Sequence, residues 1–441
     1  MSAFVKNIPL ADRLIRRNPL FYRVFRRLLQ QTERATLQER RAMAQQLLDR
    51  GRAWAARLPG YAQSDFSRPM AEQPVLAKEV LLNRADDFQS HGWFPVAHAS
   101  TGGTTGIPLQ LVRSLKSLVM EQAMIDHLAA KAEVDLTRAR VAVLRGDAIK
   151  DPNDARPPFW RPAGPRRLVF SSNHLNAENF PAFARALQQF RPDVLLAYPS
   201  SLELLTGFAE EHDSPIRFKL VITSSETLRP DTRCRVRRCF GAALVDYYGM
   251  AERVCAAYAF EDGQYRFIFP YGFTELIESD PGRYRIVGTS LWNARQPLWR
   301  YDTDDIALLP KGASAAQIER VTLGIDTFPG IEGRGSDFLL LADGSRIWTL
   351  SQVYDVMGAA SVQLMQESLD TAVLIVVPNA KFSERTLEAL RHNFYLKAPS
   401  SIKLRLDVRN APYRLANGKA PCFISTLAQS LGRAERQGVP A

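Results

Sequence analysis

Short apolar runs alternate with amphipathic stretches between residues 140 and 250. A strand followed by a helix, repeated several times, predicts a largely parallel sheet covered by helices. Ligands bind such sheets beyond the carboxyl ends of the strands. We expect the strands at 140–144, 167–172, 193–198, 219–224 and 243–248. We expect the helices at 178–190, 200–212 and 230–240.

Different patterns flank this region on both sides. Residues 11–57 carry apolar side chains at helical spacing among many Arg and Gln residues, which predicts amphipathic helices. Residues 264–310 are typical of an antiparallel meander. The expected C-terminal elements are a strand at 371–377, a helix at 383–396 and a strand at 402–408. The predicted fold class is therefore α/β, with mixed sheets and helices in a large N-terminal domain and a small α+β C-terminal domain.

Composition limits the class of protein. The length of 441 residues suggests two or three domains at about 150 residues each. Hydrophobic residues make up 46% and charged residues 23%, which excludes disordered and collagen-like chains. No apolar window is long enough for a membrane span, and charges interrupt the N-terminal stretch where a signal peptide would be apolar. Four cysteines without a CxxC motif predict neither a disulfide scaffold nor structural zinc. We expect a cytoplasmic protein.

The net charge is +11, from 57 basic and 46 acidic residues. One interpretation is a surface for nucleic acid or an acidic carrier. The other is an Arg-rich composition together with a site for an anionic nucleotide. We favour the second and expect no nucleic-acid partner, because basic residues are spread along the chain and no nucleic-acid motif occurs.

Three glycines and four hydroxyl residues form the segment 100–106. Such a loop can bring backbone N–H groups and hydroxyls to phosphate oxygens. It is not a Walker A loop, because no lysine follows Gly106. A plain flexible loop is the alternative interpretation.

Two later motifs carry aromatic and acidic side chains. In the segment 246–252, an aromatic residue can stack on a base, and Glu252 can bind Mg²⁺ together with phosphates. In the segment 300–305, carboxylates can accept hydrogen bonds from ribose hydroxyls, with a solvated turn or Ca²⁺ ligands as alternatives. Two further motifs, 333–337 and 417–419, follow towards the C-terminus.

The order and spacing of these motifs resemble the adenylate-forming superfamily of acyl-CoA synthetases, adenylation domains and luciferases. The sequence is most similar to the phenylacetate-CoA ligase-like group, in particular to the branch associated with capsular polysaccharide gene clusters. The resemblance spans about residues 58–425. It rests on STGGTTGIPL (100–109), SSNHLNAEN (171–179), AYPSSLELL (197–205), TSSETL (223–228), DYYGMAER (246–253), LWRYDTDD (298–305), IEGRGSD (331–337) and NGK (417–419).

The resemblance implies an enzyme that uses ATP and Mg²⁺ to convert a carboxylic acid to acyl-AMP and passes the acyl group to a thiol, with CoA the expected co-substrate. It implies an ATP- and acid-binding domain at 1–335, including a helical segment 1–57, and a mobile domain at 336–441. The implied catalytic residues are Lys419, Glu252 and Thr104, with Glu252 also the metal ligand. The implied nucleotide-binding residues are Ser100, Thr101, Gly102, Gly103, Thr105, Gly106, Ser225, Glu226, Thr227, Tyr247, Tyr248, Gly249, Asp305 and Arg334. The implied acyl-pocket residues are Tyr198, Pro199, Ser200 and His174.

The sequence departs from the family pattern at two points. Asp304 stands where the family has glycine, beside the ribose-binding Asp305. At the hinge, Ser336 stands where the family has a carboxylate, so that either Ser336 or Asp337 is the pivot.

Several alternatives stay open at this stage. For His174 we favour a buried structural histidine over a residue of the acyl pocket. The acyl acceptor could be a carrier protein, an amine or a sugar hydroxyl instead of CoA. A non-catalytic nucleotide-binding homologue is the alternative of another class, although such a relic would not need Lys419. The identity of the acid and the oligomeric state, for which a dimer is one option, are not determined by any motif.

Overall fold

The structure is a computed structural model of the chain. The chain forms two compact units, which we describe separately. Unit 1 comprises residues 1–103, 107–139 and 245–334, and unit 2 comprises residues 104–106, 140–244 and 335–441. The residues described are 12–92, 97–100, 109–145, 149–151, 154–334, 339–342, 346–347, 356–396, 398–415, 418–425 and 427. None of the helices in these ranges is long and apolar enough to cross a membrane.

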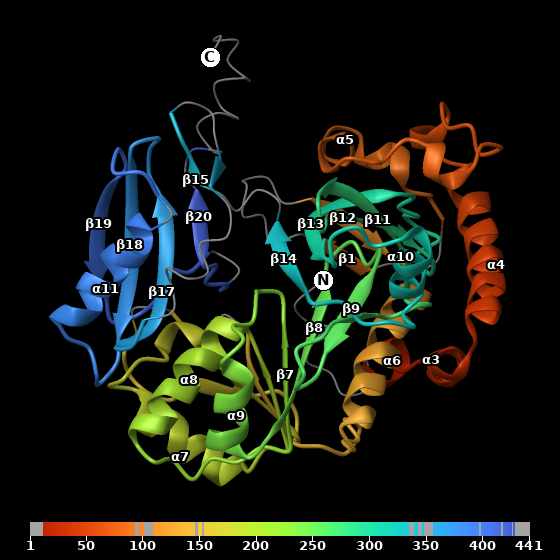
Figure 1. The fold of residues 1–441 in the computed structure, drawn as a ribbon. Coiled ribbons are helices and arrows are strands. Elements are labelled where there is room, and N and C mark those ends of the chain that lie inside the picture. Colours follow the sequence, from red (N-terminus) through yellow and green to blue (C-terminus); the bar gives the residue numbers. More distant parts are fainter. Residues whose placement is uncertain are drawn as a thin grey trace. The chain divides into compact units, whose positions relative to one another are not determined.

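Unit 1 combines N-terminal helices with antiparallel strands (Figure 1). Its helices are η1 (Asp12–Arg16), α3 (Tyr22–Arg34), α4 (Leu37–Ala55), η2 (Pro59–Tyr61), η3 (Met70–Glu72), α5 (Lys78–Asn83), η4 (Ala85–Phe88), α6 (Leu115–Lys131) and α10 (Ala315–Thr322). Its strands are β1 (Ala97–Ser100), β2 (Gln110–Arg113), β8 (Ala243–Gly249, which begins in unit 2), β9 (Ala256–Ala259), β10 (Arg266–Phe267), β11 (Gly272–Asp280), β12 (Arg283–Ser290), β13 (Tyr301–Leu308) and β14 (Gly330–Arg334). β1 pairs with β2, β9 lies between β8 and β10, and the meander has the order β11-β12-β13-β14.

The N-terminal helices of unit 1 are held against α6 by buried polar contacts. Helix α3 packs on α6 (Figure 1). Asp126 of α6 is 5% exposed and accepts hydrogen bonds from Arg17 Nε at 2.7 Å and Arg17 Nη2 at 2.8 Å. The Tyr22 hydroxyl donates to the same carboxylate at 2.5 Å, and Gln122 Nε2 does so at 2.8 Å. The buried carboxylate of Asp126 therefore anchors Arg17 and Tyr22 to α6.

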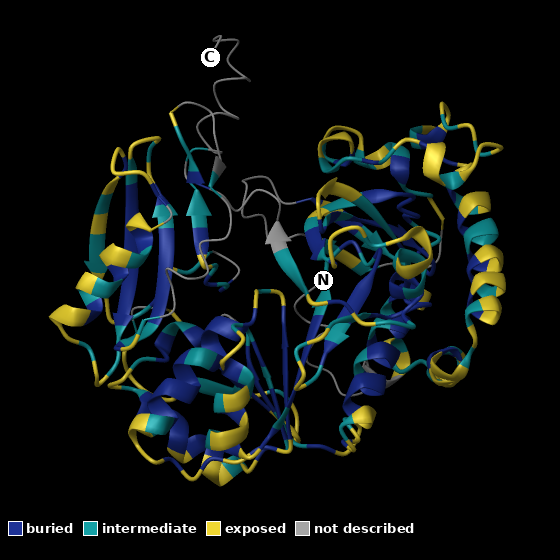
Figure 2. Cartoon of the chain, in the orientation of Figure 1, coloured by how far each residue is buried: buried dark blue, intermediate teal, exposed yellow. Residues whose placement is uncertain are grey.

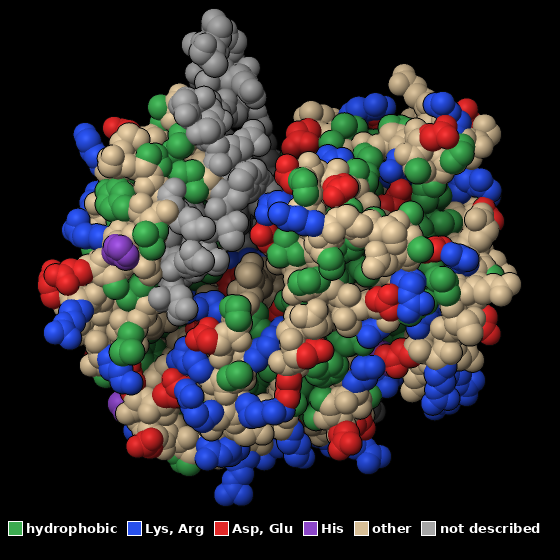
Figure 3. Space-filling view, in the orientation of Figure 1, with side chains coloured by type: hydrophobic (Ala, Val, Ile, Leu, Met, Phe, Trp, Pro, Cys, Tyr) green, Lys and Arg blue, Asp and Glu red, His purple; other side chains and the backbone are tan. Residues whose placement is uncertain are grey.

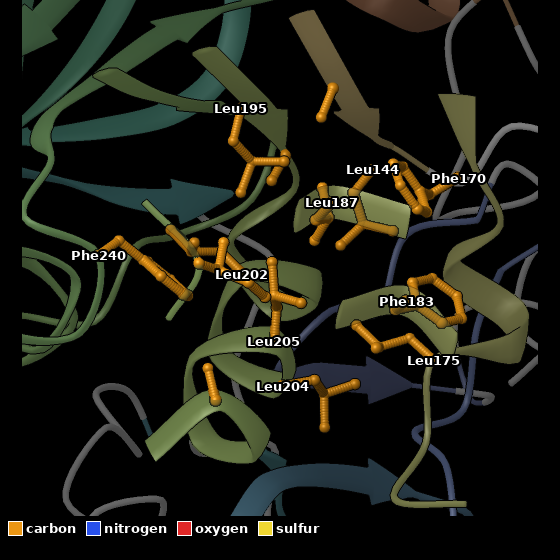
Figure 4. Close-up of a cluster of buried hydrophobic side chains, with 14 of the residues drawn as sticks. Leu144, Phe170, Leu175, Phe183, Leu187, Leu195, Leu202, Leu204, Leu205 and Phe240 are labelled. Carbon is orange, nitrogen blue, oxygen red and sulfur yellow. The ribbon is translucent and has the colours of Figure 1, made fainter. Parts of the chain in front are cut away.

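Unit 2 contains the parallel sheet. Its strands there are β3 (Val141–Leu144), β4 (Trp160–Pro162), β5 (Arg167–Phe170), β6 (Val194–Ala197) and β7 (Leu220–Ser224), in the order β7-β6-β3-β5-β4. Among these five strands, β4 is antiparallel to its neighbour and the others pair in parallel. Its helices there are η5 (Ser172–His174), α7 (Phe180–Phe190), α8 (Pro199–Glu211) and α9 (Thr232–Phe240). The helices and strands both carry buried residues (Figure 2). Phe183 and Leu202 of the helices share one buried cluster with Leu144 and Leu195 of the strands (Figure 4).

The C-terminal part of unit 2 is a second, smaller α+β layer. Its elements are β15 (Leu339–Leu340), β16 (Arg346–Ile347), β17 (Ala359–Gln366), β18 (Thr371–Pro378), α11 (Glu384–Tyr395), β19 (Lys403–Val408) and β20 (Phe423–Ser425). Four of these strands form one sheet in the order β19-β18-β17-β20, and this sheet shares a core with Leu390 and Phe394 of α11. Val377 joins the core beneath α7 and α8, so this layer rests on the parallel sheet's helices.

The α/β fold class is confirmed, and so are the alternating strands and helices, the meander, the N-terminal helices and the three C-terminal elements. Helix α6 and strands β17 and β20 were not predicted. Helix α6 buries residues on several sides, including Gln122, Asp126 and His127, so it lacks a clean apolar stripe. The division of the chain into domains at residues 335 and 336 stays a prediction.

Candidate active site

Strands β8 and β13 of unit 1 bring two predicted site residues together. The Tyr248 hydroxyl donates a hydrogen bond to Asp305 Oδ2 at 2.7 Å, across 57 residues of sequence. Burial, followed by the nearby Asp305 charge, raises the pKa of Tyr248 well above its usual value. The phenol therefore stays a donor to the carboxylate at neutral pH. The aromatic motif and the acidic motif are thus two sides of one site.

A bulge in β13 sets the position of Asp305. Residues 303–305 lie opposite Ile286, because Val287 pairs with Asp302 and Arg285 pairs with Ile306. Thr303 Oγ1 donates to the Ile286 carbonyl at 2.8 Å and accepts the Asp305 N–H at 3.2 Å. The bulge adds residues to one strand and re-aims its side chains.

Asp304 occupies the turning point of this bulge. Its φ is +62°, in the left-handed region that glycine adopts without a steric cost. Its N–H donates to Asp302 Oδ1 at 3.0 Å, and its side chain is exposed. Aspartate is among the residues that tolerate this conformation, so the departure from the family's glycine leaves the geometry of the bulge intact.

Glu252 lies in the loop after β8, where it is 9% exposed. The Tyr301 hydroxyl donates to its Oε1 at 3.0 Å. Strand β11 passes close to the residues that follow Glu252. Gly272 is required there, because a Cβ at this position would overlap the Val254 carbonyl. The described residues contain no group of three metal-binding side chains. A single carboxylate suits Mg²⁺, which keeps waters and phosphate oxygens as its other ligands.

Tyr247 and Gly249, which the sequence also assigned to the nucleotide site, are part of strand β8 itself. Tyr247 is buried in the strand, and Gly249 is its last residue. The carboxylate of Asp246, in the same motif, accepts a hydrogen bond from the Tyr265 hydroxyl and is 3% exposed. Tyr248 and Glu252 of this motif form hydrogen bonds with side chains of the segment 300–305, namely Asp305 and Tyr301.

In unit 2, predicted residues follow the carboxyl ends of neighbouring parallel strands. Tyr198 follows β6 and precedes α8, which begins at Pro199 and Ser200. Ser225, Glu226 and Thr227 follow β7, the next strand of the sheet. Ser225 has a φ of +77°, so the chain turns sharply at the strand end.

The Glu226 side chain links this turn to the C-terminal lysine loop. Its Oε2 accepts the Ser200 N–H at 2.9 Å, and its Oε1 accepts the Ala420 N–H at 2.7 Å. Burial raises the pKa of Glu226, while these two N–H donors lower it. Lys419, which is half-buried, is therefore held next to the N-terminus of α8.

Arg414 makes a second link between the same elements. Its Nη1 donates to the Gly418 carbonyl at 2.8 Å and lies 3.5 Å from Ser201 Oγ. Burial lowers the pKa of Arg414 to about 10, so it stays charged at neutral pH. The sequence assigned only the backbone of Glu226 to the site and missed Arg414. An arginine five residues before the lysine was the available signal.

His174 lies in the core next to the predicted acyl pocket. Its Nδ1 is 2.7 Å from Ser171 Oγ, and its ring stacks on Phe159 with centroids 5.1 Å apart. It is 4% exposed, and burial lowers its pKa. These contacts favour the structural interpretation of His174, and its pocket role stays a prediction.

Part of the predicted site lies outside the described residues. This holds for Thr101, Gly102, Gly103, Thr104, Thr105 and Gly106, for Ser336 and Asp337, and for Asn417. Ser100 is the last residue of β1, and Arg334 is the last residue of β14, where its backbone pairs with Asp305. The roles of all predicted site residues stay predictions.

Comparisons with known proteins bear on the fold. No protein-family model matches the sequence. Protein CapK of Staphylococcus aureus is 20% identical over 362 residues, which are 80% of each chain. Two structures of 2-hydroxyisobutyryl-CoA ligase in the postadenylation state, one with R3-HIB-AMP and one with 2-HIB-AMP, have TM-scores of 0.57 and 0.58. Both are 16% identical and cover 89% of this chain and 92% of the ligase. The chain therefore has the fold of the adenylate-forming superfamily, as its motifs predicted.

Proposed function

We propose that this protein activates a carboxylic acid with ATP, releases pyrophosphate and transfers the acyl group from acyl-AMP to the thiol of CoA. The hydrogen bond between Tyr248 and Asp305 is the observation that carries the proposal. It joins an aromatic surface for a base to a carboxylate for ribose hydroxyls, and both come from the motifs that resemble the family.

In the first half-reaction, a carboxylate oxygen attacks the α-phosphorus, the bond to the bridging oxygen breaks, and pyrophosphate leaves. Two anions approach each other and negative charge develops at the α-phosphate, so a cation placed there stabilises the transition state. Lys419 would supply this cation, and Glu252 would hold the Mg²⁺ that balances the phosphate charge. In the second half-reaction, a thiolate attacks the acyl carbon and AMP leaves.

Buried polar atoms in unit 2 support an anionic ligand near the lysine loop. Nε and Nη2 of Arg414 and the same atoms of Arg145 are buried without a hydrogen-bond partner among the described residues. Arg145 follows β3, whose last residue, Leu144, accepts the Tyr198 N–H at 3.1 Å. A buried guanidinium without an acceptor is costly unless a ligand completes it.

Acid-dependent exchange of pyrophosphate into ATP tests the first half-reaction directly. A panel of aryl, fatty, hydroxy and amino acids should contain at least one acid that supports exchange. Thioester formation with CoA, compared with carrier-protein, amine and sugar acceptors, then tests the second step. Nucleotide binding without exchange for any acid would favour the non-catalytic homologue.

We expect Glu252→Gln to weaken Mg²⁺-dependent turnover, by roughly tenfold or more, because an amide is a poor ligand for a hard cation. The Tyr301 hydroxyl can still donate to the Gln oxygen, so the fold is retained. Pyrophosphate exchange measured across a Mg²⁺ titration checks this, with Glu72→Gln on the exposed surface as the matched control. Unchanged Mg²⁺ dependence in Glu252→Gln would remove this residue from the metal site.

We expect Asp305→Ala to raise the KM for ATP, by roughly tenfold, more than the KM for the acid. A ribose contact present in both ground and transition states is uniform binding, and its loss appears in KM. Asp304→Asn is the matched control, since Asn tolerates the same φ and the side chain is exposed. Steady-state kinetics in both substrates distinguish the two residues. A large effect of Asp304→Asn alone would mean that the ribose contact is assigned one residue too late.

A further inference from the structure

One segment near the N-terminus carries an excess of positive charge. Basic residues occur throughout, but the segment 12–34 holds seven arginines and only two acidic residues, Asp12 and Glu33. Its net charge is thus +5, almost half of the +11 of the whole chain. A local excess of this size calls for an explanation other than overall composition.

Apolar side chains are exposed in the same segment. Leu14 is 56% exposed, Leu20 is 74% exposed, and Val24 is 57% exposed. Leu20 lies in the turn before α3, and Arg23, Val24 and Arg27 are exposed positions within the helix. Exposed apolar and cationic side chains therefore lie close together in this segment.

The opposite face of α3 is already occupied. Phe25, Leu29 and Thr32 are buried, and α3 packs on α6. Glu33 Oε1, near the end of α3, accepts from Lys131 Nζ at 2.8 Å and lies 3.0 Å from His127 Nε2, and the Tyr22 hydroxyl at the start of α3 donates to Asp126. The helix is therefore held as a rigid platform with its other face outward.

The outward arginines are available for an external anion. Arg23, Arg27 and Arg34 are exposed and form no ion pair with any described residue. A cavity of about 460 Å³ is lined by Arg26, Arg27, Arg34 and Lys131 and by the acidic Glu33, which pairs with Lys131. The three arginines leave a net positive lining, which suits a phosphate headgroup.

Basic side chains also gather over α7, α8 and α9 (Figure 3). There, however, Glu210 accepts hydrogen bonds from Arg235 at 2.9 Å and from Arg238 at 2.8 Å. This internal pairing reduces the charge of that surface. The α3 face differs in having both unpaired arginines and exposed apolar side chains.

We propose that the outer face of residues 14–34 binds the surface of an anionic lipid bilayer. Leu14, Leu20 and Val24 would enter the boundary between headgroups and acyl chains, and the arginines would contact lipid phosphates. Interfacial helices combine these two features, apolar insertion and attraction to anionic lipid. A nucleic acid would not need the apolar side chains.

Co-sedimentation with vesicles tests the proposal without reference to catalysis. We expect the full chain to bind vesicles of equal parts phosphatidylglycerol and phosphatidylcholine and not vesicles of phosphatidylcholine alone. Binding should weaken as salt rises. Absence of binding to the anionic vesicles, or equal binding to both, would overturn the proposal.

Variants connect the binding to this face. Arg23→Gln with Arg27→Gln should weaken vesicle binding about fivefold for each arginine, and Leu20→Ser with Val24→Ser should also weaken it. The matched controls are Arg138→Gln and Leu396→Ser, since both side chains are exposed elsewhere. Thermal unfolding by circular dichroism identifies variants that fail to fold. Equal losses in properly folded controls would contradict the assignment, as would binding of a DNA duplex that needs the arginines but not Leu20 and Val24.

Discussion

Replacing Lys419 by alanine is expected to remove most pyrophosphate exchange, by roughly 10²–10³-fold, the effect of a single well-placed donor at a developing negative charge. The loop that carries Lys419 is fixed by Glu226, which accepts the Ala420 N–H at 2.7 Å, and by Arg414. Thioester formation from preformed acyl-AMP should be much less affected, because that step does not use the lysine. If the C-terminal domain moves, as the family resemblance implies, Lys419 would serve the first half-reaction and leave the site for the second.

Lys403→Ala is the matched control, since Lys403 is exposed on β19 in the same C-terminal layer. Both half-reactions should stay near wild type in that variant. If Lys419→Ala behaves in the same way, Lys419 is a surface lysine without a catalytic role. Equal large losses in both half-reactions would indicate that the C-terminal layer no longer folds.

Asp126→Asn should destabilise unit 1 by about 3–5 kcal/mol, towards the lower value because Arg17 keeps some access to solvent. The substitution removes the charge that pairs with Arg17 and leaves Tyr22 and Gln122 with a poorer acceptor. Urea unfolding at neutral pH, with m-values compared between variants, measures the change.

Asp135→Asn provides the matched control for this prediction. Asp135 forms an exposed ion pair with Arg138 at 3.7 Å, and its side chain is 56% exposed. Exposed pairs contribute about 0–1 kcal/mol, and Asn can still accept the Thr137 N–H that closes the turn. Similar losses of unfolding free energy in both variants would mean that the buried Asp126 contributes no more to stability than the exposed Asp135.

The alternation of apolar and polar positions by itself determined the alternating strands and helices of unit 2, the meander of unit 1 and three C-terminal elements, β18, α11 and β19. These predictions succeeded because each element buries one regular face, and that period is written locally in the sequence. Helix α6 was missed for the same reason. Its buried Asp126 and His127 have their side-chain partners in the N-terminal segment, at Arg17 and Glu33. A local sequence pattern cannot indicate a buried polar residue whose partner is distant in the sequence.

For the candidate site, too, the local sequence predicted some features and only the tertiary structure decided others. The types and order of motif residues were available from the sequence, but the contacts were not. Tyr248 meets Asp305 only because β8 and β13 bring them together, and the bulge that aims Asp305 depends on its register with β12. Glu226 reaches Ala420 across 194 residues. Side-chain partners at such separations are decided by how elements pack, since hydrogen bonding of a buried polar group depends on its neighbours in space.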